Sequence, residues 1–253
     1  MLEGRVAGTA VLTGILLSWE FAVSRGFLPA NYVPAPSSVV VSLIQGFLSG
    51  ELLKHLLITL QRFVSGYAIA SIVGIPLGVA LGRWPLLRAA FEPIIEFFRP
   101  MPVVAILPIA MFVLGLGHTM AIAVIAFGSG WISLLYTMDG VRGVDPTLVD
   151  TGRTFGIRGA RMFWSIVLPA ASPQIVTGLR VSLAISLILA IVIELIVGFG
   201  GLGSFIGISQ GAVRIPDTYA GIVLVGALGY LLNQAFRLVE GKIMAWHRGY
   251  TKH

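Results

Sequence analysis

The chain has 253 residues, of which 57% are hydrophobic and only 11% are charged, and its formal net charge is +6. Soluble domains carry about 25% charged residues, and a chain of this length cannot bury so much apolar side chain in one water-soluble core. The basic residues lie between apolar runs and form no continuous patch, which argues against nucleic-acid binding. Because the sequence has no cysteine, disulfides, thiol catalysis and cysteine-ligated metals are excluded. Composition therefore indicates an all-α integral membrane protein.

The apolar runs predict about six transmembrane helices in one domain that takes up the whole chain. The first run, after Arg5, resembles a signal peptide, but it continues through Glu20-Phe-Ala-Val23 without a clear cleavage site, so we expect a retained helix. Prolines crowd the third run between residues 100 and 108, so residues 91–116 either cross the membrane or re-enter it. The expected spans are residues 6–24, 58–82, 100–116, 119–137, 174–198 and 218–239.

Lysine and arginine are distributed unequally between the two sides of the predicted spans. With the N-terminus in the cytoplasm, 13 of the 17 basic residues lie inside and 4 lie outside, at Arg25, Lys54, Arg62 and Arg214. Cytoplasmic loops of membrane proteins carry an excess of basic residues. An even number of spans then places both termini in the cytoplasm.

Small residues recur at every fourth position in two spans, where they favour close helix packing. The second span carries Gly66, Ala70, Gly74, Gly78 and Gly82, and the fifth carries Gly178, Ser182, Ser186 and Ala190. Glu194 follows on the fifth span, and a carboxylate inside the membrane is costly unless it meets water or a partner. Glu194 therefore either makes a structural hydrogen bond to a neighbouring helix or lies beside a transport pathway.

The cytoplasmic connection over residues 138–173 predicts a short helix, a tight turn and a second short helix. Asp145 and Pro146 are typical of a helix start, and Gly156 of a helix end. A second segment over residues 159–167 leads into the fifth span. Leu148, Val149 and Phe155 give the first helix an apolar surface. The connection is either a docking knob or a loop packed on its own protein.

Within this connection, Asp150-Thr151-Gly152 is followed after three residues by Gly156, and after nine more by Ile166, with Leu168-Pro169 completing the pattern. The spacing resembles the cytoplasmic loop of ABC importer permeases, which reads Glu-Ala-Ala, three residues, Gly, nine residues, Ile, one residue, Leu-Pro. The first triplet departs from that pattern, but it keeps one carboxylate and small neighbours.

The resemblance extends over nearly the whole chain and is greatest to the branch that imports nitrate, taurine and aliphatic sulfonates. The stretches that carry it are Thr59-Leu-Gln-Arg62 with Gly66, Gly74-Ile-Pro-Leu-Gly78, Arg99-Pro-Met-Pro102 with Leu107-Pro108, Gly140 to Asp145-Pro146, Gly178-Leu-Arg180, Glu194, and Gly200-Gly-Leu-Gly203. It implies a type I importer permease fold in the bacterial cytoplasmic (inner) membrane, and a small, anionic solute.

The resemblance also implies partners and residue roles. Two copies of a separate ATPase subunit would bind ATP and Mg²⁺, since this chain has no Gly-x-x-x-x-Gly-Lys-Ser/Thr loop and no cofactor, metal or catalytic residue of its own is expected. An external binding protein would deliver the solute, and a homodimer would form the pore. The implied coupling residues are Asp150, Thr151, Gly152, Arg153, Phe155, Gly156, Ile166, Leu168 and Pro169. The implied pathway residues are Ser182, Ser186 and Glu194.

Two other classes of protein fit the sequence less well. A self-sufficient secondary transporter would show inverted repeats and paired intramembrane charges, and neither is evident. An intramembrane enzyme would need catalytic groups, yet the four histidines match no metal-binding spacing and no Gly-x-Ser-x-Gly motif occurs. The identity of the solute stays open, because no cluster of basic residues within the spans marks an anion site.

Overall fold

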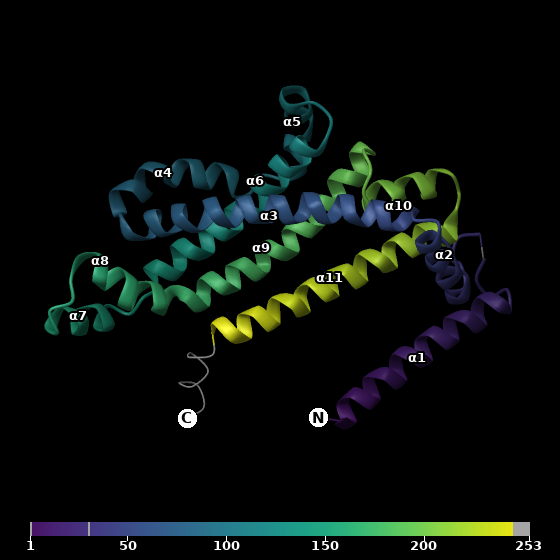
Figure 1. Cartoon of the computed structure of the whole chain (residues 1–253), viewed down its shortest axis with the longest axis horizontal. Coiled ribbons are helices and arrows are strands. Elements are labelled where there is room, and N and C mark those ends of the chain that lie inside the picture. Colours follow the sequence, from purple (N-terminus) through teal and green to yellow (C-terminus); the bar gives the residue numbers. More distant parts are fainter. Residues whose placement is uncertain (1, 30, 245–253) are drawn as a thin grey trace. The chain divides into compact units, whose positions relative to one another are not determined.

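The computed structural model describes residues 2–29 and 31–244, which form helices with no β-strand among them (Figure 1). The elements are α1 (Leu2–Ser24), α2 (Pro36–Leu48), α3 (Glu51–Arg83), α4 (Pro85–Phe98), η1 (Val103–Ile106), α5 (Leu107–Leu114), α6 (His118–Arg142), α7 (Pro146–Thr154), α8 (Gly159–Met162), η2 (Phe163–Val167), α9 (Leu168–Val197), α10 (Leu202–Gly211) and α11 (Ile215–Ile243). The chain divides into two compact units, Met1–Thr59 with Glu194–Leu228 and Leu60–Ile193 with Gly229–His253.

Four helices of the described residues are long and apolar enough to cross a membrane. They are Glu51–Arg83, His118–Arg142, Gly159–Val197 and Ile215–Lys242. Three of them contain the predicted spans 58–82, 119–137 and 218–239, and Gly159–Val197 contains all of 174–198 except its last residue. The helices extend beyond most of the predicted limits because the helical backbone continues past the apolar core. The first predicted span lies within α1 (Leu2–Ser24), in which Ala10–Ser24 is a shorter apolar helix.

The third predicted span is part of a bent pair of helices. Pro85–Phe98 and Val103–Leu114 together are apolar enough to cross, but an angle of 89° separates them. Pro100 and Pro102 lie at the bend, where they remove backbone donors and keep the preceding residues out of the helical region. Residues 83–99 lie between the second and third predicted spans, and the structure has the 14-residue helix α4 there.

The first unit is held together by polar contacts between segments far apart in the sequence. Ser42 on α2 donates a hydrogen bond of 2.5 Å to Asp217 on α11. Tyr219 donates one of 3.2 Å to the carbonyl of Tyr32. The ring of Tyr219 also lies 6.2 Å from that of Trp19 on α1. These contacts connect α1, α2 and the segment at Tyr32 with the first turns of α11.

The second unit is built on close contact between α3 and α6, which cross each other in Figure 1. A Cβ atom at Gly74 would lie 2.9 Å from the carbonyl oxygen of Gly130, and one at Gly78 would lie 2.5 Å from that of Leu134. Gly66 and Gly82 meet side chains of α6 in the same way. The predicted packing face of the second span is therefore confirmed.

Two clusters of apolar side chains pack α6 against its neighbours in the second unit. Leu81, Ile95, Leu134 and Met138 form a buried cluster of α3, α4 and α6. A second cluster joins Val141 of α6 to Ala171 and Ile175 of α9. Lipid tails are as apolar as these side chains, so the hydrophobic effect does not drive membrane helices together. The bundle is stabilised instead by close packing, which the small residues and the two apolar clusters provide.

Candidate functional site

The connection over residues 138–173 contains the short helix that its sequence predicts. Asp145 is the N-cap of α7, and its carboxylate accepts a hydrogen bond of 2.8 Å from the backbone N–H of Thr147. Pro146 occupies the first turn, where its missing N–H costs nothing. The hydrogen bond from Thr147 lowers the pKa of Asp145 from its usual value. The lowered pKa favours the ionised carboxylate, and the positive end of the helix dipole stabilises its negative charge.

The helix ends in a Schellman turn that requires glycine. The N–H of Ile157 donates to the carbonyl of Gly152 at 2.9 Å, and the N–H of Gly156 donates to that of Arg153 at 2.9 Å. Gly156 has a φ of +77°, a conformation that other residues adopt only with strain. The backbone conformation therefore explains why the loop pattern has glycine at position 156, where the chain reverses between α7 and α8.

The two ends of the loop pattern are in contact. A Cβ atom at Gly152 would overlap the Cδ1 of Ile166, and it would also lie 3.1 Å from the Cε of Met162. Ile166 lies on η2, a five-residue π-helix that continues into α9 at Leu168. The guanidinium of Arg83 at the end of α3 lies 5.6 Å from the ring of Phe163. Gly152 and Ile166 therefore fix α7 against the beginning of the fifth span.

The helix α7 keeps an apolar surface exposed. Phe155 is 79% exposed and Leu148 is 49% exposed. Asp150 and Arg153 form a surface ion pair of 2.8 Å beside them. Such pairs contribute little to stability, so both charges remain available to a partner. An exposed aromatic ring on a rigid, capped helix is suited to insertion into a groove of another protein.

Ser182 and Ser186 lie in the contact between α9 and α6. Both side chains are fully buried. Ser182 donates a hydrogen bond of 2.9 Å to the carbonyl of Ser129 on α6, and Ser186 donates one of 2.8 Å to the carbonyl of Ser182. Gly178, one turn before Ser182, allows the ring of Tyr136 to approach the α9 backbone. The geometry gives this stripe a packing role.

Glu194 is buried at the N-terminus of α10. Its Oε2 accepts hydrogen bonds from the hydroxyl of Thr59 at 2.8 Å and from the N–H of Gly203 at 3.2 Å. The hydroxyl of Thr59 in turn accepts a bond of 2.8 Å from the N–H of Leu202. The first free N–H groups of α10 are therefore bonded to Thr59 and Glu194, and the carboxylate lies at the positive end of the helix.

The surrounding backbone makes room for this carboxylate. Gly201 has a φ of +96°, and a Cβ atom there would overlap the carboxyl group of Glu194. Its carbonyl is 2.8 Å from the Nδ1 of His55, whose ring lies 5.5 Å from that of Phe205. In the sequence, the stretches around Thr59 and Gly201 stand out only through their resemblance to the importer permeases. Nothing in their local pattern showed that they meet Glu194.

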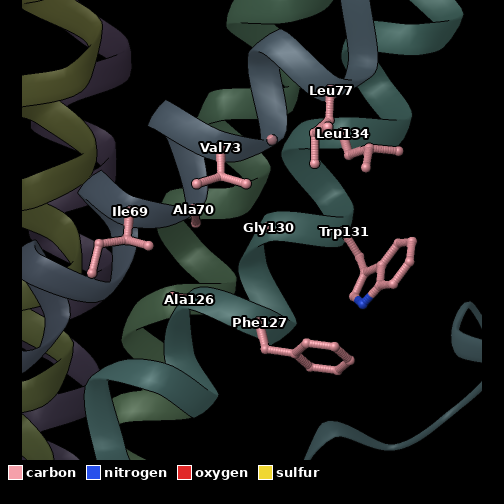
Figure 2. A pocket seen from close by; sticks show the side chains of 10 residues that line it. Ile69, Ala70, Val73, Leu77, Ala126, Phe127, Gly130, Trp131 and Leu134 are labelled. Carbon is pink, nitrogen blue, oxygen red and sulfur yellow. The ribbon is translucent and has the colours of Figure 1, made fainter. Parts of the chain in front are cut away.

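A pocket of about 280 Å³ lies between α3 and α6 (Figure 2). Figure 2 shows the side chains of Phe127 and Trp131 projecting from one face of α6, while Val73 and Leu77 come from α3. Its lining is almost entirely apolar. A charged or hydrated solute would lose its hydrogen bonds there without replacement, so this pocket is suited to hydrocarbon.

Comparison with known proteins shows one family. The model of the binding-protein-dependent transport system inner membrane component matches residues 70–244. A protein of Methanocaldococcus jannaschii described as an ABC transporter permease is 32% identical over 85% of this chain and 82% of its own length. The taurine transport system permease protein of Escherichia coli is 29% identical over 93% of this chain and 88% of its own length. Further relatives are permeases for aliphatic sulfonates and bicarbonate.

A solved structure has a similar fold. A chain of the methionine ABC transporter MetNI, in an inward-facing conformation, matches with a TM-score of 0.64 over 74% of this chain and 94% of its own length. The sequence identity is 21%. The expected importer-permease fold is thereby confirmed.

Proposed function

The chain belongs to the family of binding-protein-dependent transport system inner membrane components and is a multi-pass permease subunit of an ABC importer, and we propose that its solute is a small organic or inorganic anion. Permeases of this family work with an ATPase and a substrate-binding protein. The solutes of the relatives, which include sulfonates and bicarbonate, support the proposed class. Nitrate and taurine belong to the same range of candidates.

In this proposal α7 is the coupling helix that docks into the ATPase subunit. The observation that carries it is the exposed ring of Phe155 on a helix fixed by the Schellman turn and by the contact of Gly152 with Ile166. A rigid knob can transmit a rigid-body movement, whereas a flexible loop would absorb it. The proposed coupling residues are Asp150, Thr151, Gly152, Arg153, Phe155, Gly156, Ile166, Leu168 and Pro169.

The remaining parts of the proposal concern the assembly. ATP and Mg²⁺ bind to a separate subunit present in two copies, two copies of this chain form the pathway, and the complex lies in the bacterial cytoplasmic membrane. The described residues supply four spans, or five with the bent pair, which supports a pathway shared between two chains. Ser182, Ser186 and Glu194 belong to the wall of that pathway, where they hold its helices in place.

Co-purification tests the partners. The chain is isolated in mild detergent from its native host, and the proteins that accompany it are identified by mass spectrometry. We expect an ATPase with a phosphate-binding loop and an external binding protein. Recovery of the chain alone, from preparations in which other membrane complexes stay intact, would contradict the proposal and favour a self-sufficient transporter.

Phe155→Glu tests the coupling helix. A charge in the apolar contact costs about 2 kcal/mol or more, and we expect transport and transport-linked ATPase activity to fall by about thirtyfold. Thr147→Glu in the first turn of the same helix adds the same charge at an exposed position and is the control. Both variants should reach the membrane in normal amounts. Equal, undiminished transport by the two would refute the role of Phe155.

A further inference from the structure

A second cavity, of about 600 Å³, lies where α4 ends and the chain bends towards η1. Residues of α4, η1, α6 and α9 line it, and all of them belong to the unit that contains Leu60–Ile193. Its polar groups come from Arg99, Tyr136, Asp139 and Gln174. The volume is in the range of small-molecule sites, and a few polar groups among apolar walls are typical of such sites.

The bend between α4 and η1 is what places Arg99 on the wall of this cavity. Arg99 is the C-cap of α4, and the prolines on its far side end the helix there. The preceding residue, Phe98, stacks on the ring of Trp131 with the centroids 5.5 Å apart and an angle of 20° between the planes. Phe98 also meets Phe127 edge-on at 5.5 Å. These aromatic contacts fix the end of α4 against α6 and so position Arg99.

The guanidinium of Arg99 has no carboxylate partner among the residues that the structure describes. Asp139 faces the same cavity, but its carboxylate pairs with Arg142 at 3.8 Å. Arg99 is an exposed residue on the wall of this cavity. A planar guanidinium with several N–H donors matches the oxygens of a carboxylate or a sulfonate. The apolar pocket of Figure 2 offers no such group.

We propose that this cavity is a solute-binding subsite of the permease itself, in which Arg99 binds the anionic end of a small organic sulfonate. The inference rests on the proposed function and adds a site to it. Trp131 supplies an apolar wall for the carbon chain, while Tyr136 and Gln174 supply further hydrogen-bonding groups. A phospholipid phosphate has the same chemistry as a sulfonate, so the test separates the two.

The chain has no cysteine, which allows a single reporter to be placed in the cavity. Ile132→Cys, an apolar lining position on α6, is made in the complete importer. It is treated with the anionic reagent sulfonatoethyl methanethiosulfonate and the cationic reagent trimethylammonioethyl methanethiosulfonate. Taurine and ethanesulfonate are then added as protecting solutes. Leu86→Cys, 86% exposed and outside the cavity, is the control reporter.

We expect Arg99 to favour the anionic reagent at position 132. Arg99→Gln should reduce the ratio of anionic to cationic reaction rates by about tenfold, because one charge-assisted bond is lost. Arg99→Gln should also raise the solute concentration needed for half-protection by a similar factor. Arg99→Lys keeps the charge and should lie between. Arg88→Gln on the same helix removes a charge outside the cavity and should behave like the parent protein.

The labelling experiment tests the subsite at Arg99, and a separate uptake assay tests the proposed solute class. Unchanged rate ratios and unchanged protection in Arg99→Gln would overturn the subsite, as would absence of protection in the unsubstituted Arg99 background. A rate ratio that changes with the content of anionic lipid, but not with taurine or ethanesulfonate, would assign Arg99 to a lipid headgroup and also overturn it. Uptake of labelled taurine by the complete importer in proteoliposomes tests the solute class independently.

Discussion

Thr59 makes two hydrogen bonds at once at the N-terminus of α10. Its hydroxyl donates to the carboxylate of Glu194 at 2.8 Å and accepts from the N–H of Leu202 at 2.8 Å. Both side chains are almost completely buried. In such surroundings an unsatisfied polar group costs far more than a hydrogen bond adds at the surface. The hydroxyl therefore matters more than the shape of the side chain.

The pair Thr59→Val and Thr59→Ser tests this role of the hydroxyl. Valine keeps the shape but leaves the N–H of Leu202 and the carboxylate without this partner, which should lower the free energy of unfolding by about 1–3 kcal/mol. Serine keeps the hydroxyl and loses one methyl group, at a cost of about 1 kcal/mol. The measurement is the midpoint of thermal unfolding in detergent. Equal midpoints for the two variants would show that the hydroxyl has no such role.

Two helices end in the same kind of turn with different residues. Gly156 ends α7 with a φ of +77°, whereas Val213 ends α10 with a φ of +57°. The N–H of Arg214 donates to Ser209 and that of Val213 donates to Gln210, so α10 also ends in a Schellman turn. A β-branched residue is strained in this conformation. The turn after α7 is relaxed, and the turn after α10 is not.

Opposite substitutions in these turns should have opposite effects. Gly156→Ala should destabilise the turn after α7 by about 1 kcal/mol, and Val213→Gly should stabilise the turn after α10 by a similar amount. Resistance to limited proteolysis at each turn, followed by mass spectrometry, measures both. A stabilising effect of Gly156→Ala, or a loss of stability in Val213→Gly, would contradict the assigned backbone conformations.

Among the elements, the glycines of α3 show how much a sequence pattern predicts. Their spacing of four residues indicated a packing face, and the structure places that face on α6. The partner itself was not predictable, because membrane helices pack through small residues that carry no label for a particular neighbour.

Gly78→Ala tests this packing and has a matched control. A methyl group at Gly78 would lie 2.5 Å from the carbonyl oxygen of Leu134 and 2.7 Å from the Cβ of Thr137, so α3 and α6 must separate. We expect a loss of about 1–3 kcal/mol. Gly226→Ala in α11 meets nothing within 4 Å and should be neutral or stabilising by up to about 1 kcal/mol. Similar thermal midpoints for both variants would contradict the close approach.

Other elements were not predictable from local pattern. The bend of 89° after α4 lies at Pro100 and Pro102, and the sequence shows that these prolines interrupt a helix. The direction that the chain takes after them depends on how Phe98 packs against Trp131, which the sequence does not show. The short helix α10 lies in a stretch rich in glycine, and its N-terminus is satisfied by Thr59 and Glu194, which are distant in sequence. In contrast, α7 was predictable because its cap, proline and terminal glycine are local signals.

For the whole molecule, the number of copies is the first quantity to determine. The described residues of one chain provide four candidate spans, or five if the bent pair is one span. We expect native mass spectrometry of the purified importer to show two copies of the 26.9 kDa chain for every two ATPase subunits. Release of the ATPase should leave a permease dimer. A complex with one copy of this chain and one of a different permease would replace the homodimer by a heterodimer.

The distribution of basic residues predicts the orientation of the chain in the membrane. Because the chain has no cysteine, a single cysteine introduced at a chosen position can test that orientation. Phe27, 75% exposed after α1, is expected outside, and Leu86, 86% exposed at the start of α4, is expected in the cytoplasm. In intact cells a membrane-impermeant maleimide should label Phe27→Cys but not Leu86→Cys, and permeabilisation should make both reactive. Labelling of Leu86→Cys alone in intact cells would invert the topology. The helix α7, which follows α6 on the Leu86 side of the predicted topology, would then face away from any cytoplasmic ATPase, and the coupling proposal would fail with it.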